Sequence, residues 1–142
     1  MKVLDHRDVR QLLEQANFFR ELSPAGKTAI ASICAPKSLR KREVLFHEGD
    51  RGTAVYLLAT GNVRLSRTSP SGHETVIKIV RPGEFFAEVI LFELDRYPVA
   101  ATATTPSTVL VAPRAQIHQL LAARDFRNDF IAMLMKKQRY LA

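Results

Sequence analysis

The sequence contains one cysteine, Cys34, and no tryptophan in its 142 residues. A single thiol excludes an internal disulfide, a zinc site built from several cysteines, and an iron–sulfur cluster that needs several thiolates from this chain. We therefore expect Cys34 to be a small buried hydrophobic residue on a helix.

Long apolar runs are also missing from the sequence. None approaches the ~20 residues that span a membrane. The first residues, MKVLDHRDVRQLLEQ, carry charges where a signal peptide would have its apolar core. We expect the protein to stay in the cytoplasm and to have no membrane partner.

The composition fits one globular domain, with 46% hydrophobic and 25% charged residues. The net charge of +7, from 21 basic and 14 acidic residues, permits contact with nucleic acid or with an anionic ligand. The basic residues cluster in segments 37–42 and 136–139. Neither cluster interleaves aromatic residues or lies in a recognisable pair of DNA-reading helices, so both are interpreted as solvated, one at a strand edge and one at a helix end.

The hydrophobic period divides the chain into about 1–35 with helices, 36–112 with strands, and 113–142 with helices. Apolar residues at helical spacing predict a helix over 5–16, and a second helix from Pro24, with Ser23 as its N-cap, to about Cys34. Glycine and proline turns then separate short extended segments, which indicates a closed or two-sheet antiparallel β structure. The expected strands cover 44–46, 54–59, 63–66, 73–80, 99–105 and 108–111.

The last helix is apolar on two sides, which is typical of a helix that contacts both its own domain and a partner. Asp125 is its expected N-cap. Ile131 and Met135 form one stripe. The other is expected to form the seam of a homodimer, and consists of Phe126, Phe130, Met133, Leu134 and Leu141.

The stretch from Gly83 to Ala103 has the pattern of a strand end, a short helical turn and a second strand. Glu88 lies at the start of that turn, where backbone N–H groups lack partners and favour an anion. This pattern has two interpretations. The stretch builds a pocket for a small ligand, or Glu88 is only an acid favoured by the helix dipole.

The order of helices, glycine-rich β segment, pocket turn and terminal helix resembles the cyclic nucleotide-binding domain of CRP/FNR-family transcription regulators. The residues that carry the resemblance run in order and at family spacing over about 17–141: Phe46, Glu48-Gly49-Asp50, Tyr56, Gly61, Val63, Gly72, Glu74, Pro82-Gly83, Phe85 and Glu88. The resemblance implies a mainly β fold with flanking helices, a β-roll or jelly roll that ends in part of a dimerisation helix. It also implies an effector sensor rather than an enzyme, with no catalytic or metal site.

The resemblance assigns Glu88 to the ribose of a nucleotide but departs from the family at the phosphate. Ala87 replaces a glycine, Tyr97 falls at the phosphate-binding arginine and Pro98 at the following Ser or Thr, while Arg96 is one residue early. Ordinary cyclic AMP or GMP is therefore expected to bind weakly or not at all, because tyrosine offers no charged fork. An apolar or differently charged effector, or an empty pocket, is expected instead. The ligand-binding residues are predicted to be Lys78, Phe86, Ala87, Glu88, Val89, Arg96, Tyr97 and Pro98. Two of these could replace the missing arginine: Arg96 if its turn rearranges, and Lys78 if strand alternation points it into the roll.

The sequence identifies neither the effector nor a cofactor. Haem is one alternative, because the pattern around Tyr97 looks more like the non-nucleotide branches of the family, and haem needs an axial ligand. The candidates are His6, His47, His73 and His118, each interpreted as a surface or structural histidine. A cupin-like metal enzyme on a related β-roll is a further alternative, but the four histidines are scattered and form no His-x-His pair.

In the family, a helix-turn-helix domain follows the dimer helix, and this sequence shows none. It is expected to be an isolated sensor domain or a stand-alone binding module, and the first is favoured. The resemblance therefore assigns DNA binding to a C-terminal domain that this sequence does not contain.

Overall fold

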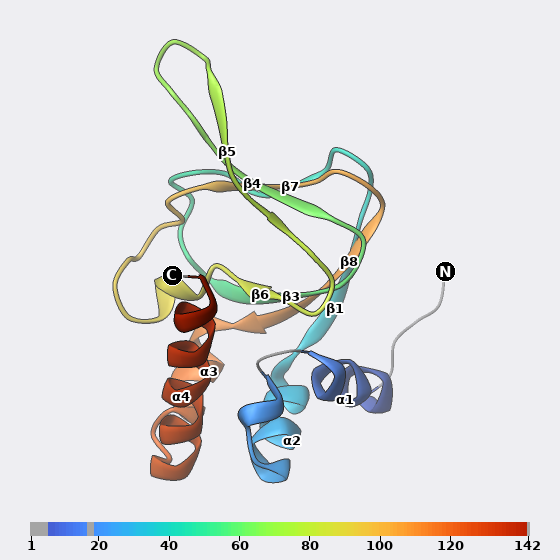
Figure 1. The fold of residues 1–142 in the computed structure, drawn as a ribbon, viewed down its shortest axis with the longest axis vertical. Coiled ribbons are helices and arrows are strands. Elements are labelled where there is room, and N and C mark those ends of the chain that lie inside the picture. The colour runs from blue at the N-terminus through green and yellow to red at the C-terminus, as the bar shows by residue number, and fades with distance from the viewer. Residues whose placement is uncertain (1–5, 17–18, 142) are drawn as a thin grey trace.

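The computed structural model describes residues 6–16 and 19–141. The elements follow one another along the chain as shown in Figure 1. They are α1 (His6–Gln15), η1 (Phe19–Glu21), α2 (Pro24–Ile33), β1 (Ala35–Leu39), β2 (Val44–Phe46), β3 (Ala54–Thr60), β4 (Val63–Thr68), β5 (Glu74–Val80), β6 (Phe85–Phe86), η2 (Glu88–Leu91), β7 (Ala100–Ala103), β8 (Ser107–Pro113), α3 (Arg114–Leu120) and α4 (Arg124–Leu141).

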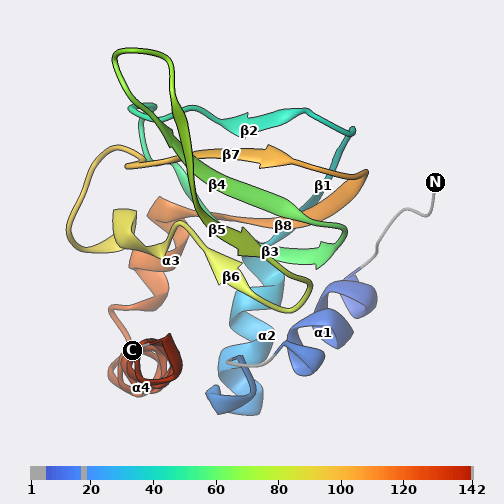
Figure 2. The ribbon, with the colours of Figure 1, turned by 45° about the horizontal axis from the view of Figure 1, so that its top comes forward.

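The strands form two four-stranded antiparallel sheets, in the orders β1-β8-β3-β6 and β2-β7-β4-β5. Figures 1 and 2 show that the helices lie beside the first sheet, while the second sheet lies on the far side of the roll. The β4–β5 hairpin extends beyond the body of the roll. This mainly β roll with flanking helices confirms the fold class expected from the sequence.

Strand β3 is buried on both faces because it lies between the helices and the second sheet. Residues 54–58 of this strand are all buried, which explains its continuous apolar run. The next turn requires glycine at Gly61, whose φ is +93° and where a Cβ would lie 2.1 Å from the Ser107 Oγ atom.

The N-terminal helices match the prediction except at Cys34, which is half-buried and lies just after the end of α2 instead of on the helix. The Ser23 hydroxyl accepts a 3.1 Å hydrogen bond from the Gly26 N–H and caps α2 as predicted. Val9 and Leu13 of α1 are buried, as their spacing indicated. None of the helices in the described part of the chain is both long and apolar enough to cross a membrane.

Helix α4 differs from the prediction in which of its faces is buried. Phe126, Phe130 and Met133 are buried in the chain's own core, and Leu134 packs partly against it, so this stripe is not available as the expected dimer seam. The exposed apolar side chains are those of the other stripe, Ile131 and Met135, at 44% and 58% exposure. The side chain of Leu141 lies outside the described residues.

The start of α4 also differs from the prediction. The helix begins at Arg124, so Asp125 lies in its first turn instead of capping it.

Candidate ligand-binding site

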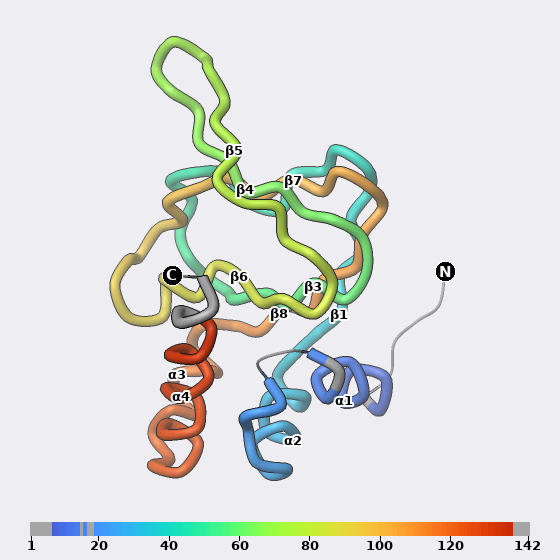
Figure 3. The backbone as a smooth tube through the Cα atoms, viewed as in Figure 1, coloured from blue at the N-terminus to red at the C-terminus, as the bar shows by residue number. Residues whose placement is uncertain are grey.

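A cavity of about 230 Å³ opens where the pocket turn, the roll and α4 meet. It contains seven of the eight predicted ligand-binding residues, which are Lys78, Phe86, Ala87, Glu88, Val89, Tyr97 and Pro98. Figure 3 shows the segment after β6 bulging beside the upper part of α4. The rest of the lining comes from Phe46, Leu65, Ile77, Val99 and Lys137.

Ala87 sets the direction of the pocket turn. Its φ of 69° and ψ of 16° place it in the left-handed region immediately before η2. A residue with a Cβ pays about 1–2 kcal/mol for this conformation, which accounts for the glycine that the family resemblance expected here. The turn places Glu88 at the first position of η2, on the cavity wall.

Two contacts fix η2 against the rest of the molecule. A Cβ on Gly52 would lie 2.5 Å from the Ile90 Cγ2 atom, so only glycine allows this approach, and the Gly52 N–H donates to the Asp95 carbonyl at 2.6 Å. Next to it, the Leu91 carbonyl lies 2.8 Å from the His118 Nε2 atom of α3. Both contacts hold the C-terminal half of η2, and Glu88 lies at its first position.

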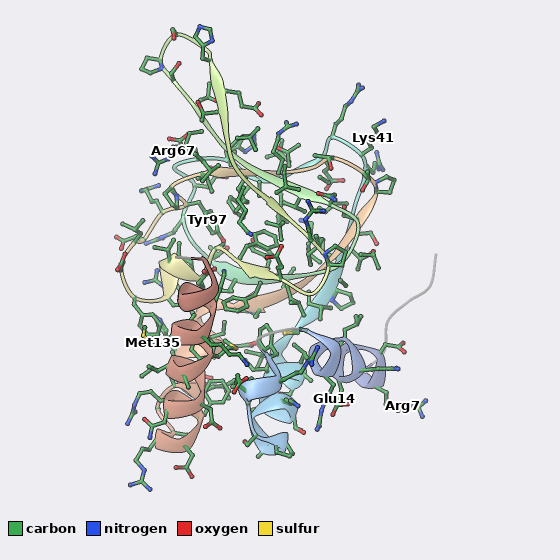
Figure 4. The ribbon with its side chains drawn as sticks, in the orientation of Figure 1. Arg7, Glu14, Lys41, Arg67, Tyr97 and Met135 are labelled. Atoms are coloured by element: carbon green, nitrogen blue, oxygen red, sulfur yellow. The ribbon has the colours of Figure 1, made fainter. Side chains whose placement is uncertain are left out.

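Tyr97 forms the inner wall of the cavity. Its hydroxyl donates to the Ala54 carbonyl at 2.8 Å and accepts from the Ala54 N–H at 3.2 Å. Because its one proton is used on Ala54, the Tyr56 hydroxyl, 3.3 Å away, must be the donor in the contact between the two tyrosines. Figure 4 shows Tyr97 inside the roll, between the sheets.

The tyrosines belong to an aromatic stack. The Tyr97 ring lies 3.8 Å from the Phe46 ring, with an interplanar angle of 18°, and Tyr56 stacks on Phe86 at 5.4 Å. Burial, together with the neighbouring Tyr97 hydroxyl, raises the pKa of Tyr56 well above its usual value. The position at which the resemblance expects a phosphate-binding arginine is thus filled by an uncharged side chain whose hydroxyl is fully hydrogen-bonded.

Arg96 is the one predicted site residue that the structure does not bring to the cavity. Its exposed guanidinium donates to the Gly49 carbonyl at 2.9 Å, and its backbone pairs with Arg51 in an isolated β-bridge. The backbone of Tyr97 is bonded on both sides to the loop before β3, with the Tyr97 N–H on the Asp50 carbonyl at 2.9 Å. This pairing points Arg96 outward, so Arg96 could reach a ligand in the cavity only after its turn rearranges.

Lys137 is a cavity residue that the sequence does not reveal, because the basic segment 136–139 has the pattern of a solvated helix end. Its ammonium is buried and contacts the Glu88 Oε1 atom, the Phe85 carbonyl at 2.9 Å, and the face of the Phe85 ring. The signal that could have found it is helical spacing. Lys137 lies four residues after Met133 and continues the buried stripe of α4.

Lys78 is the other cation on the cavity, reached from β5. It forms an ion pair with Glu84, with 3.2 Å between the Nζ and Oε2 atoms. The cavity therefore combines apolar and aromatic walls with one carboxylate and two lysines, each lysine already paired with an acid. Such a site suits a mostly apolar ligand with a few polar groups.

The histidines do not support a haem site. His47 and His73 are exposed, His118 contacts Leu91, and none of these three lines the cavity. The side chain of His6 lies outside the described residues. Within the described residues, no group of three or more His, Cys, Asp or Glu side chains could hold a metal ion, so the donor set of a cupin-like enzyme is not assembled there.

The comparisons with known proteins agree with this geometry. The family model described as the cyclic nucleotide-binding domain matches residues 36–124. The cyclic AMP receptor protein of Thermus thermophilus is 32% identical over 118 residues, which cover 83% of this chain and 49% of that protein.

Solved structures extend the similarity to nearly the whole chain. The sensor domain of the transcriptional regulator DNR from Pseudomonas aeruginosa is 28% identical, with a TM-score of 0.79, over 96% of this chain and 90% of that one. The N-terminal domain of a transcriptional regulator from Streptomyces coelicolor is 26% identical, with a TM-score of 0.77, over 92% of both chains. The chain spans about half the length of the curated relatives it matches, 49% and 58% in two cases.

Proposed function

Because the chain belongs to the cyclic nucleotide-binding domain family, we propose that it is the effector-sensing domain of a CRP/FNR-type transcription regulator. A small molecule enters the cavity beside η2 and changes how α4 lies against the roll. The sensor works in the cytoplasm as a homodimer, with α4 as its dimerisation element. DNA binding is assigned to a C-terminal domain outside this sequence.

One observation carries the proposal: the cavity has walls from two parts of the molecule that a sensor must connect. Glu88 and Val89 come from the pocket turn, and Lys137 comes from α4. A ligand that contacts both walls has a different free energy of binding in different positions of α4, which is the requirement for shifting a conformational equilibrium.

The effector is proposed to be something other than an ordinary cyclic nucleotide. A cyclic phosphate carries a negative charge, and Tyr97 offers it no free donor, since its hydroxyl is used on Ala54 and Tyr56. Losing a charge-assisted contact to a buried anion costs about 2–5 kcal/mol, or roughly 30- to 4,000-fold in affinity. Lys78 could approach a phosphate only by leaving Glu84.

Calorimetric titration with cyclic AMP and cyclic GMP tests this restriction. We expect no micromolar binding of either nucleotide. Micromolar binding would mean that Lys78 or another cation takes the phosphate and that the site has been assigned the wrong ligand. The absorption spectrum of the protein, as isolated and after haem addition, tests the haem alternative in the same preparation.

The sensing role itself is tested by a thermal-shift screen of small molecules, followed by amide hydrogen exchange with each stabilising compound. A compound that protects η2 and also changes exchange in α4 supports a sensor. Compounds that stabilise the protein without affecting either element would contradict the proposal.

A further inference from the structure

The ammonium of Lys137 is the most deeply buried cation among the ion pairs of the described residues. Its side chain is 10% exposed, against 26% for its partner Glu88. The neighbouring lysine, Lys136, pairs with Glu21 at the surface, where the two side chains are 32% and 38% exposed. Two adjacent lysines of α4 therefore bind acids in very different surroundings.

Lys137 is bound on three sides. Besides Glu88, its Nζ atom donates to the Phe85 carbonyl at 2.9 Å and lies 4.2 Å from the centre of the Phe85 ring. Charge-assisted hydrogen bonds and a cation over an aromatic face are both stronger away from water. These contacts join the C-terminal part of α4 to β6 and to the first residue of the pocket turn.

We infer that Lys137 locks α4 onto the pocket turn by holding one oxygen of Glu88, so that a ligand which binds through both oxygens of Glu88 must first displace the protein's own ammonium. This inference rests on the proposed sensing function of the cavity. Glu88 is the only carboxylate among the described cavity residues, and Lys137 already binds its Oε1 atom. The lysine therefore occupies one of the two oxygens that a pair of neighbouring ligand donors would need.

The lock defines the chemistry of the ligand that can open it. The ligand must offer hydrogen-bond donors, such as neighbouring hydroxyls or an ammonium, to the Glu88 carboxylate. Its body must be apolar or aromatic, because the opposite walls are formed by Phe46, Phe86 and Tyr97. An acidic group directed at Glu88 would be repelled.

Displacement of Lys137 also acts on α4. Once the ammonium leaves Glu88, it loses the Phe85 contacts as well, because all three partners lie together. The last turns of α4 are then released from β6. By thermodynamic linkage, the coupling is reciprocal. A ligand bound to Glu88 shifts α4 toward its released state, and release of α4 raises the affinity for the ligand by the same factor.

Amide hydrogen exchange on the protein without ligand tests the lock. The variants are Lys137→Met, Glu88→Gln and the double variant, with Lys136→Met as the matched control. Methionine keeps the apolar stem over Phe85, and glutamine keeps the size of Glu88. Near-UV circular dichroism verifies that each variant is folded.

Each single variant is expected to raise exchange in the last turns of α4 about tenfold. The double variant should raise it no further, because both substitutions break the same Lys137–Glu88 ion pair. Lys136→Met should change exchange less than twofold, because an exposed ion pair contributes little. Additive effects in the double variant, or equal effects of Lys136→Met and Lys137→Met, would overturn the lock.

Titration with adenosine and 2′-deoxyadenosine tests the inhibitory role. Adenosine presents neighbouring hydroxyls without a phosphate, and the deoxy form lacks one of them. Lys137→Met should bind adenosine about tenfold more tightly than the unmodified protein, with no gain for 2′-deoxyadenosine. Adenosine binding that is no tighter to Lys137→Met, undetectable binding included, overturns the inhibitory role.

Failure of the sensing function would look different. The exchange experiment would still show coupling between Glu88 and Lys137, but no compound in the screen would protect η2 in either the unmodified protein or Lys137→Met.

Discussion

At the scale of single residues, Tyr97 shows how one side chain changes the chemistry of a cavity. Its hydroxyl forms hydrogen bonds with the N–H and the carbonyl of Ala54 and accepts one from the Tyr56 hydroxyl, while its ring stacks on Phe46. An arginine at this position would place a charge in the same aromatic surroundings. Tyr97 therefore has two effects. It takes the position of the expected phosphate-binding arginine, and it joins the segment before β7 to strand β3.

Replacement of Tyr97 by phenylalanine should lower the free energy of unfolding by about 1–3 kcal/mol, because it leaves buried polar groups of Ala54 without a partner. Urea denaturation measures this change. Tyr56→Phe is the matched control and should cost less, since it removes a donor but leaves the Tyr97–Ala54 hydrogen bonds intact. Equal stability of Tyr97→Phe and the unmodified protein would contradict the structural role given to this hydroxyl.

Cys34 should be nearly inert to alkylation. Burial raises the pKa of its thiol to about 12, and the thiolate is the reactive form. Compared with a thiol of pKa 9, the thiolate population at pH 8 is about a thousandfold smaller, and reaction with iodoacetamide should slow accordingly. Mass spectrometry follows the reaction, with the urea-unfolded protein as the control. Alkylation at the same rate in folded and unfolded protein would show that the thiol is accessible.

At the scale of elements, the sequence predicted most strands and helices because the chain changes its hydrophobic period at glycine and proline turns. It also predicted the short helical turn η2, because an apolar run of four residues between extended segments is too short for a core helix. The face of α4 that packs inward was not predictable in this way. Both stripes are apolar, and the choice depends on tertiary contacts such as the burial of Phe130 and Met133.

Lys137 and Arg96 show the same limit at the site. A lysine in a basic segment is interpreted as solvated, and only its contacts with Glu88 and Phe85 show that it is a wall of the cavity. Arg96 had the right charge near the right position, but the pairing of its neighbour Tyr97 with Asp50 directs it outward. The direction in which a loop side chain points is set by hydrogen bonds between segments that are distant in sequence.

We propose that a homodimer contact uses the exposed stripe of α4, because the other stripe is mostly buried in the chain's own core. Ile131 and Met135 lie one turn apart, and Figure 4 shows Met135 directed away from the body of the molecule. Ile131→Asp should shift sedimentation toward the monomer, because it places a charge in the proposed apolar contact. Thermal unfolding should change little, since the side chain is 44% exposed.

Phe130→Asp provides the contrasting variant. It should unfold the protein, because it places a charge in the chain's own core. A dimer that survives Ile131→Asp unchanged would contradict the assignment of this stripe to the partner.

At the scale of the whole molecule, the net charge is +7, but several of the basic side chains form ion pairs with acidic residues of the same chain. Lys137 binds Glu88, Lys78 binds Glu84, and Arg64 binds Glu74 at 2.9 Å. Other basic residues are exposed on the turn between β1 and β2, where Figure 4 shows Lys41 extending into solvent. This turn belongs to the roll and not to a helix that could enter a major groove.

The protein alone should therefore bind DNA only weakly and without sequence preference, through phosphate contacts at such exposed cations. For this type of binding, the affinity falls with salt with a logarithmic slope of about −0.9 per phosphate neutralised. Fluorescence anisotropy with two duplexes of equal length and unrelated sequence, at low and physiological salt, measures both properties. We expect the two duplexes to bind equally and both to be released as salt rises, because no described element presents side chains to base edges. Binding that resists salt and prefers one duplex would show that this domain reads DNA itself, and the division of labour between a sensor and a separate DNA-binding domain would then be wrong.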